Sequence, residues 1–302
     1  MGINYPHLER AAAPWILVGV AIAAVSAQAP DPAGSSDVRA WLARVGDRIE
    51  QYYTRAQSIM CEETVQLQHL GADLLPDGGH IRRLVYELRV AWEAAPDGGK
   101  PPEATVLRQL LRVDGRPPSA RDEDACMDPK PVSPEPLGLL LPHRRSDFVF
   151  TWRGTARERG RPSVTIDYKS ARVLPPDIVW KDNCVSIDLP GRTRGRIWVD
   201  RQTGDVLRLD EQLTGQFEFR VPRTQLRRVP LPLTMTVERA DSSIRYRPVS
   251  FHDPDETILL PESINSLQVI RNSGAPRMRI IQTFSNYRRF ITGGRVLPPP
   301  VQ

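Results

Sequence analysis

The sequence has 302 residues, and 40% of them are hydrophobic, which is enough to build a substantial core. Lys and Arg number 41 and Asp and Glu number 36, so the formal net charge is +5. The basic residues, almost all of them Arg, are spread along the chain among acidic residues. This distribution lacks the clustered basic surface of nucleic-acid-binding proteins, so we expect no nucleic-acid partner. A peripheral contact with anionic membrane headgroups is compatible with it.

Residues 11–25 form an apolar run without charge, and small residues follow it up to Ala29. The pattern predicts a secretory signal peptide over residues 1–27, cleaved after Ala27, because Pro30 disfavours a cut after Ala29. The run is shorter than the roughly 20 apolar residues of a membrane-spanning helix, and an uncleaved anchor is the alternative. No cysteine lies near the cleavage site, so no lipobox is expected. The protein is therefore expected in the periplasm or as a secreted protein.

A long amphipathic helix is predicted after a flexible lead-in over residues 28–35. Ser36 or Asp37 is a suitable N-cap. Apolar residues then recur at spacings of three and four, which places them on one face of a helix of about six turns. They are Val38, Trp41, Leu42, Val45, Ile49, Tyr52, Tyr53 and Ala56. We expect a single domain over residues 36–297 and a disordered tail over residues 298–302.

After this helix the period of the apolar residues changes to two, which is typical of antiparallel strands with one buried and one solvated face. The clearest alternation spans residues 206–221, where the apolar residues are odd-numbered: Leu207, Leu209, Leu213, Phe217, Phe219 and Val221. Turn signals rich in Gly, Pro and Asp separate this segment from others of the same kind. Short helices are expected near residues 119–126 and 134–141, and the Pro-rich segment 117–136 has the character of an insertion.

These elements predict an α+β fold in which a large, curved antiparallel sheet wraps around the N-terminal amphipathic helix. A sheet of eight or more strands must curl, and its apolar face must be covered. Only one long helix is available for that task. Either the sheet closes and fills itself with side chains, or it curves around the helix and leaves part of its inner face as a groove. Such a groove would be apolar and would bind an acyl chain or a similar ligand.

Two segments are similar to patterns of a known group: GRIWVDRQTGDVLRL at residues 195–209 and QTFSNYRRF at residues 282–290. With the order of signal peptide, long helix and antiparallel strands, the chain resembles the LolA/LolB/LppX group of periplasmic lipid and lipoprotein carriers. The resemblance implies an unclosed β-barrel lidded by helices around a hydrophobic cavity, with no catalytic signature. This chain departs from the group by its length, by the segment 117–136 and by its three cysteines.

Five residues are the candidate lining of a ligand groove. Trp92 and Trp152 lie in the apolar phases of their strands, as do Phe217 and Phe219. Glu211 occupies the apolar phase of the clearest strand, where a carboxylate is costly unless it is paired. It therefore marks an arginine partner, the mouth of a groove or a bend in the strand. One carboxylate of the pair Glu62-Glu63 is also expected to point inward, the alternative being a solvated strand end.

The cysteines predict one disulfide and one remaining thiol, since an exported chain with three cysteines leaves one unpaired. Three pairings are open, and we expect Cys126–Cys184 because both lie in polar stretches, whereas Cys61 opens a strand. No zinc-ligand spacing is present. The cluster of one His and three carboxylates at residues 252–256 is as typical of a turn as of a metal site. We therefore expect no metal and no cofactor.

No nucleophile elbow, zinc-protease motif or phosphate-binding loop is present. We therefore expect non-catalytic binding or transport of a lipid or lipidated protein in the cell envelope, through a hydrophobic groove. One alternative is an envelope protein–protein interaction module with a fully packed core. Another is a hydrolase with catalytic residues dispersed in the sequence.

Overall fold

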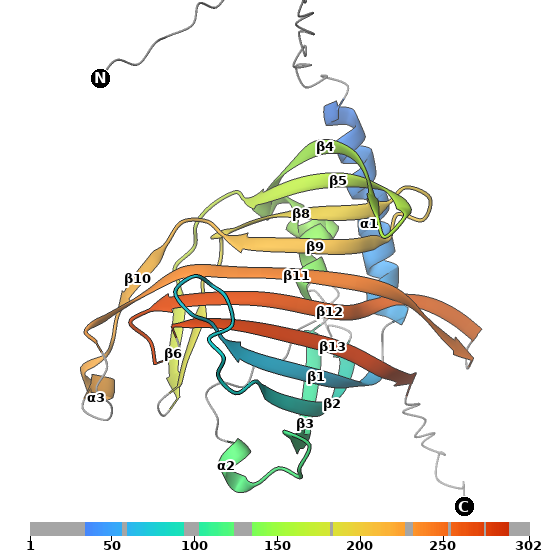
Figure 1. Ribbon diagram of the computed structural model, residues 1–302. Helices are drawn as coiled ribbons and strands as arrows, with labels where there is room; N and C mark the ends of the chain where they lie inside the picture. The colour runs from blue at the N-terminus through green and yellow to red at the C-terminus, as the bar shows by residue number, and fades with distance from the viewer. Residues whose placement is uncertain are drawn as a thin grey trace, which may run out of the picture. The chain divides into compact units, whose positions relative to one another are not determined.

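An antiparallel sheet of eleven strands forms the body of the chain (Figure 1). A computed structural model describes residues 34–55, 59–93, 103–123, 135–181, 184–226, 232–252, 255–274 and 276–289, all within the compact unit Ala33–Gln302. The predicted signal peptide, the tail 298–302 and Cys126 lie outside these residues. No helix in the described ranges is long and apolar enough to cross a membrane.

The strand order of the large sheet is β3-β2-β1-β13-β12-β11-β9-β8-β5-β4, and β10 also pairs with β11. No described strand joins the two ends, β3 and β4, so the sheet is unclosed, as predicted. A separate hairpin consists of β6 (Asp177–Lys181) and β7 (Cys184–Asp188). The strands of the large sheet are β1 (Ile59–His69), β2 (Arg82–Glu93), β3 (Glu103–Val113), β4 (Phe148–Glu158), β5 (Arg161–Ser170), β8 (Thr193–Asp200), β9 (Val206–Leu213), β10 (Phe217–Arg220), β11 (Thr234–His252), β12 (Asp255–Arg271) and β13 (Arg277–Arg289).

The only long helix of the described chain is α1 (Gly34–Arg55), which packs against β4, β12 and a short 3-10 helix, η1 (Glu135–Leu140). In the view of Figure 1 it lies behind β4, β5, β8 and β9. Its buried residues Val38, Leu42, Val45 and Ile49 belong to the predicted stripe, which confirms the amphipathic pattern. The other helical turns are α2 (Ala120–Glu123), η2 (Pro142–Asp147) and α3 (Arg223–Leu226).

The predicted alternation over residues 206–221 is divided between two strands. β9 ends at Leu213 and β10 begins at Phe217, and Gly215 between them has a φ of +76°. A positive φ is accessible to glycine without steric cost, so the chain turns there. β9 pairs with residues 242–245 of β11, whereas β10 pairs with residues 234–237. The odd-numbered phase continues across the break, which is why the sequence pattern does not reveal it.

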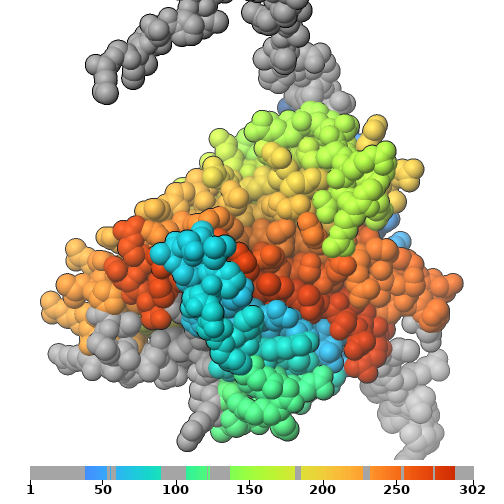
Figure 2. Space-filling view, viewed as in Figure 1, coloured from blue at the N-terminus to red at the C-terminus, as the bar shows by residue number. Residues whose placement is uncertain are grey.

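Charged side chains on the large sheet are paired with one another. Asp167 accepts hydrogen bonds from Arg153 and from Arg196, and the Arg196 Nε lies 2.6 Å from it. Arg208 binds Asp210 at 2.7 Å and lies over the ring of Trp198. These basic residues therefore have counter-ions within the sheet. Figure 2 shows the strands as neighbouring bands of side chains.

Candidate functional site

The buried side chains of the described residues form three separate hydrophobic clusters. The largest lies under α1 and includes strand residues such as Ile166, Ile197 and Leu209. The second comprises residues of β1, β2, β3 and β13. The third lies at β10 and the start of β11, where the hairpin β6–β7 contributes Ile178, Trp180, Val185 and Ile187. Much of the apolar surface that the sequence assigns to a groove is therefore packed.

The five predicted groove residues do not all lie together. Phe217 and Phe219 are stacked, with ring centroids 6.1 Å apart, in the third cluster. Trp152 packs against the first cluster. The side chain of Trp92 lies outside the described part of the structure, as does that of Cys184. The assignment of the five residues to a ligand groove stays a prediction. The disulfide Cys126–Cys184 also stays a prediction.

Glu211 is partly buried on β9, where it pairs with Gly195 of β8 and Ser242 of β11. The Tyr168 hydroxyl donates a hydrogen bond of 3.1 Å to its carboxylate. Burial raises the pKa of Glu211, and Asp188 of the hairpin raises it further. Its hydrogen-bond donor is therefore a tyrosine rather than the arginine that the sequence led us to consider. It lines a polar recess of about 270 Å³, to which β9, β11, β12 and β13 contribute side chains.

Glu63 is the carboxylate of the Glu62-Glu63 pair that points inward, as predicted. Its side chain is 1% exposed and accepts two hydrogen bonds from Arg108. Gln282 of β13 donates a third, of 2.7 Å, to the same carboxylate. The two partners lie on β13, which is next to β1, and on β3, which is separated from β1 by β2, so this group holds the sheet together and does not face a cavity found in the described residues.

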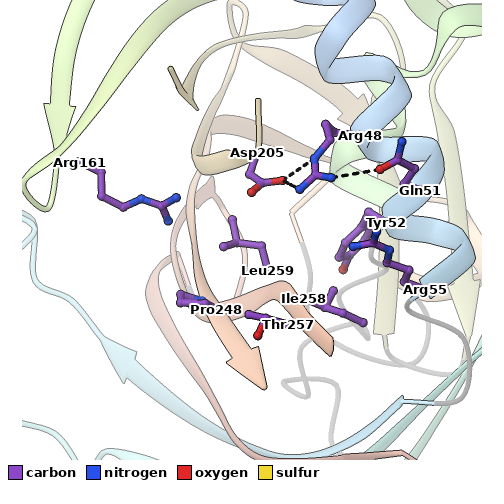
Figure 3. Close-up of a pocket in the computed structure, with 10 residues that line it drawn as sticks. All are labelled: Arg48, Gln51, Tyr52, Arg55, Arg161, Asp205, Pro248, Thr257, Ile258 and Leu259. Atoms are coloured by element: carbon purple, nitrogen blue, oxygen red, sulfur yellow. Dashed lines mark hydrogen bonds and ion pairs between the residues drawn. The ribbon is translucent and has the colours of Figure 1, made fainter. Parts of the chain in front are cut away.

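A cavity lies between α1 and the hairpin of β11 and β12, and we call it the arginine pocket (Figure 3). Its volume is about 470 Å³, within the range of roughly 300–1,000 Å³ for small-molecule sites. It is lined by Arg48, Gln51, Tyr52, Arg55, Arg161, Asp205, Pro248, Thr257, Ile258 and Leu259.

The helix supplies four of these side chains because residues 48, 51, 52 and 55 lie on one face of α1. Arg48 is held by Asp205 at 2.9 Å and donates a hydrogen bond of 3.1 Å to Gln51. Arg161, at the start of β5, lies across the pocket from the helix in Figure 3. Its guanidinium pairs with Asp200, which is not part of the lining, at 2.8 Å.

The remaining lining is largely apolar. Ile258 is buried and belongs to the cluster under α1, and Leu259 packs against that cluster. Pro248 contributes an exposed ring, and burial raises the pKa of Tyr52, so this phenol stays neutral. The pocket therefore combines an apolar surface with a cationic lining, since three arginines and one aspartate leave a formal charge of +2 (3 − 1 = 2).

Sequence reasoning did not identify the arginine pocket. The spacing of Arg48 and Arg55 on one helix face is visible in the sequence, and so are the turns that precede Arg161 and Asp205. Arg161 and Asp205 both lie more than 100 residues after Arg55 in the sequence. Only the pairing order of the strands brings them to one cavity, and alternation does not encode that order.

The cluster at residues 252–256 and a dispersed hydrolase site are the other candidates for metal binding and catalysis that the sequence offers. Among the described residues no group of three or more His, Cys, Asp and Glu is arranged to hold a metal ion. Glu256, from the proposed hard-metal cluster, pairs with Arg289. His80 lies 3.1 Å from Asp114, but its side chain is 73% exposed at a turn rather than in a cleft. No catalytic arrangement of His, acid and hydroxyl is formed by these contacts.

Seventeen chains of solved structures match this chain. A DUF1329-family protein from Desulfovibrio piger is 11% identical, with a TM-score of 0.39, over 84% of this chain and 94% of that one. A putative outer membrane lipoprotein-sorting protein domain from Vibrio parahaemolyticus is 10% identical, with a TM-score of 0.32, over 82% and 93%. The MucA/MucB complex of Pseudomonas aeruginosa contains a chain that is 11% identical, with a TM-score of 0.21, over 82% and 99%.

No protein-family model matches the sequence, and no curated protein matches it significantly. At these identities and TM-scores the likenesses carry no conclusion about function, which has to be inferred from the chain's own residues.

Proposed function

We propose that this chain is an exported, non-catalytic protein of the cell envelope that binds and transports a lipid or a lipidated protein. The apolar part of the ligand lies in the arginine pocket, on Leu259, Pro248 and Ile258. The observation that supports this proposal is the cavity of about 470 Å³ between α1 and the β11–β12 hairpin, which has an apolar floor. The predicted signal peptide supports a periplasmic or secreted location.

The position of the pocket is suited to a ligand that enters and leaves. One wall is a single helix, and that helix packs against the sheet mainly through its buried stripe. Pockets that take small molecules are commonly lined by apolar side chains with a few polar groups that fix orientation. The arginine pocket has this composition, because Gln51 and Thr257 accompany the apolar floor and the charged residues.

Native mass spectrometry of protein purified from the periplasm without detergent tests the proposal. We expect a stoichiometric adduct of lipid size that denaturation releases. The variant Leu259→Asn, which makes the floor polar, should lose the adduct. The matched control Leu233→Asn changes a leucine that is 73% exposed elsewhere and should retain it. Absence of an adduct, together with no uptake of an added fluorescent fatty acid, would contradict the proposal.

A second candidate function is a protein–protein interaction module of the envelope. The packing of the sheet into three clusters favours it, and so does the edge strand β3, where Leu107 is 61% exposed and Leu111 is 37% exposed. An edge strand with free backbone groups can accept a further strand. A photo-crosslinking residue at position 107 should then capture a specific protein in cells, and the same residue at Val173 should not.

A further inference from the structure

The cations of the arginine pocket differ in how fully they are neutralised. Asp205 is 2.9 Å from Arg48 and is shared by two nitrogen atoms of that guanidinium, so Arg48 has an internal counter-ion. Arg55 is exposed, and within the described residues no acidic side chain pairs with it. The positive charge that is available to a ligand therefore lies on the other arginines of the lining and not on Arg48.

Arg161 retains free donors although it has an acidic partner. Asp200 accepts hydrogen bonds from the backbone N–H groups of Gln202 and Thr203, so its carboxylate is committed to the turn that it caps. The ion pair joins one nitrogen of Arg161 to one oxygen of Asp200. A guanidinium has five N–H donors in a planar fork, so the others remain for a ligand. The side chain is 39% exposed.

We propose that the arginine pocket selects an amphiphile with a single oxyanion head group, held by Arg55 and Arg161, and one acyl chain that lies on Ile258 and Leu259. This inference rests on the proposed function and specifies its ligand. The head group is a carboxylate or a phosphate, as in a fatty acid or a single-chain phospholipid. A guanidinium binds either group with charge-assisted hydrogen bonds, which are about twice as strong as neutral ones.

The size and charge of the pocket support one chain and one anion. The lining carries a formal charge of +2, and although Asp200 offsets the charge of Arg161, the remaining positive charge disfavours a cationic head group and leaves a neutral ester without a strong partner for the arginines. A volume of about 470 Å³ lies in the lower half of the range for small-molecule sites, so it suits a slender chain better than a branched lipid. The aliphatic stems of the arginines extend the apolar surface toward the head group.

The test is displacement of a fluorescent fatty acid from the mature protein after removal of bound lipid. The competitors share one chain length and differ in head group: a fatty acid, an alkyl phosphate, the methyl ester of the fatty acid and an alkyltrimethylammonium. We expect the two oxyanions to compete and the ester and the ammonium to bind at least about 10-fold more weakly. The ratio between the acid and the phosphate distinguishes the two sources of the head group.

Arg55→Ala should weaken binding of the oxyanions by about 10-fold and leave binding of the ester unchanged, since it removes a charge-assisted contact. Arg161→Ala should act in the same direction. Because Arg161 also pairs with Asp200, the thermal unfolding of the Arg161→Ala variant is compared with that of the parent protein. The matched control Arg39→Ala removes an exposed charge from α1 outside the pocket and should change nothing.

The outcomes separate the inference from the proposed function. If the methyl ester competes as well as the acid, or if Arg55→Ala binds both equally well, the head-group selection is wrong while the carrier function stands. If the fluorescent fatty acid does not bind at all, the proposed function itself fails. Displacement of the bound fatty acid by an acidic peptide, but not by the alkyl phosphate, would also overturn the inference and would point to a protein ligand.

Discussion

Glu63 and Arg108 form a two-pronged ion pair inside the sheet, with side chains that are 1% and 10% exposed. The Arg108 Nε lies 2.8 Å from one carboxylate oxygen, and a second nitrogen bonds the other oxygen. The same guanidinium lies 4.5 Å from the ring centroid of Tyr86. The pair connects β1 with β3 across β2, so it specifies the pairing of the strands at this end of the sheet.

We expect Glu63→Gln to lower the free energy of unfolding by about 3–5 kcal/mol, because it leaves the buried Arg108 cation without its counter-ion. Glu63→Leu combined with Arg108→Met should cost much less, since neither charge is then buried. Urea unfolding of the single and double variants measures both values. The surface pair Glu87–Arg89, whose side chains are 21% and 50% exposed, is the control, and Glu87→Gln should cost about 1 kcal/mol or less. Equal losses for Glu63→Gln and Glu87→Gln would contradict the prediction.

The sequence predicts the elements better than it predicts their partners. The apolar stripe of α1 specifies which side chains are buried, because helical periodicity alone determines the face. The alternation in β1 likewise places Glu63 on the inner face. It does not show that Arg108 will meet Glu63, since that contact requires β2 to lie between β1 and β3. The same limit applies to the arginine pocket, where Arg48 meets Asp205 only after the strands are ordered.

Breaks within a continuous pattern are also hidden. Phe217 and Phe219 keep the phase of β9, so the pattern joins them to the core under α1. The structure instead places them with the β6–β7 hairpin, because the chain turns at Gly215. The hairpin partners Ile178 and Trp180 lie in a short segment whose apolar residues show too little alternation to predict that contact.

Gly195 allows β8 to approach β9 closely. A Cβ atom built there would lie 2.0 Å from the carbonyl oxygen of Asp210 and 2.7 Å from the ring of Tyr168. Because backbone would have to move, we expect Gly195→Ala to destabilise the protein by about 1–3 kcal/mol. Gly274→Ala is the control, since nothing lies within 4 Å of its added Cβ. Thermal and urea unfolding give both values, and a neutral Gly195→Ala would refute the close approach.

Glu211 should make stability depend on pH. Burial raises its folded pKa above the unfolded value of about 4.3. The folded protein therefore binds the proton more tightly, and this contribution is complete below the unfolded pKa and is lost as the pH rises through the folded pKa. Glu211→Gln keeps this side chain neutral at every pH. The free energy of unfolding of the variant, relative to that of the parent protein, should therefore increase between pH 4 and pH 8.

Measurement of urea unfolding at several pH values checks this prediction. The control is Glu218→Gln, because Glu218 is exposed on β10. This exposed substitution should change the free energy of unfolding little. A Glu211→Gln variant whose difference from the parent protein does not vary with pH would show that the Glu211 carboxyl has the same pKa in the folded and unfolded chains.

Cys61 should be unreactive in the native protein. It is 3% exposed, and burial, with the nearby Glu63 charge, raises its pKa to about 12. Very little thiolate exists at pH 8, and the thiolate is the reactive form. Iodoacetamide should therefore leave Cys61 unmodified in the folded protein and should modify it in concentrated urea, as peptide mass spectrometry can show. Equal labelling rates in both conditions would mean that β1 opens readily in the folded protein.

The hairpin β6–β7 should depend on Phe219 for its attachment to the sheet. Phe219 is 6% exposed and belongs to the cluster that contains Ile178 and Trp180 of the hairpin. Phe219→Ala removes the contacts of this ring and leaves a cavity, which costs about 3–5 kcal/mol for a buried phenylalanine. Because the lost contacts are local, we expect hydrogen exchange over residues 177–188 to accelerate more than exchange in β5 and β8.

Phe251→Ala is the matched control for this prediction. Phe251 is 7% exposed, so it is buried to the same degree, but it belongs to the cluster under α1. Its loss should lower global stability without a selective effect on residues 177–188. Hydrogen exchange measured by mass spectrometry on both variants separates the two cases. If Phe219→Ala and Phe251→Ala accelerate exchange in the hairpin equally, the hairpin is held by the sheet as a whole and not by this cluster.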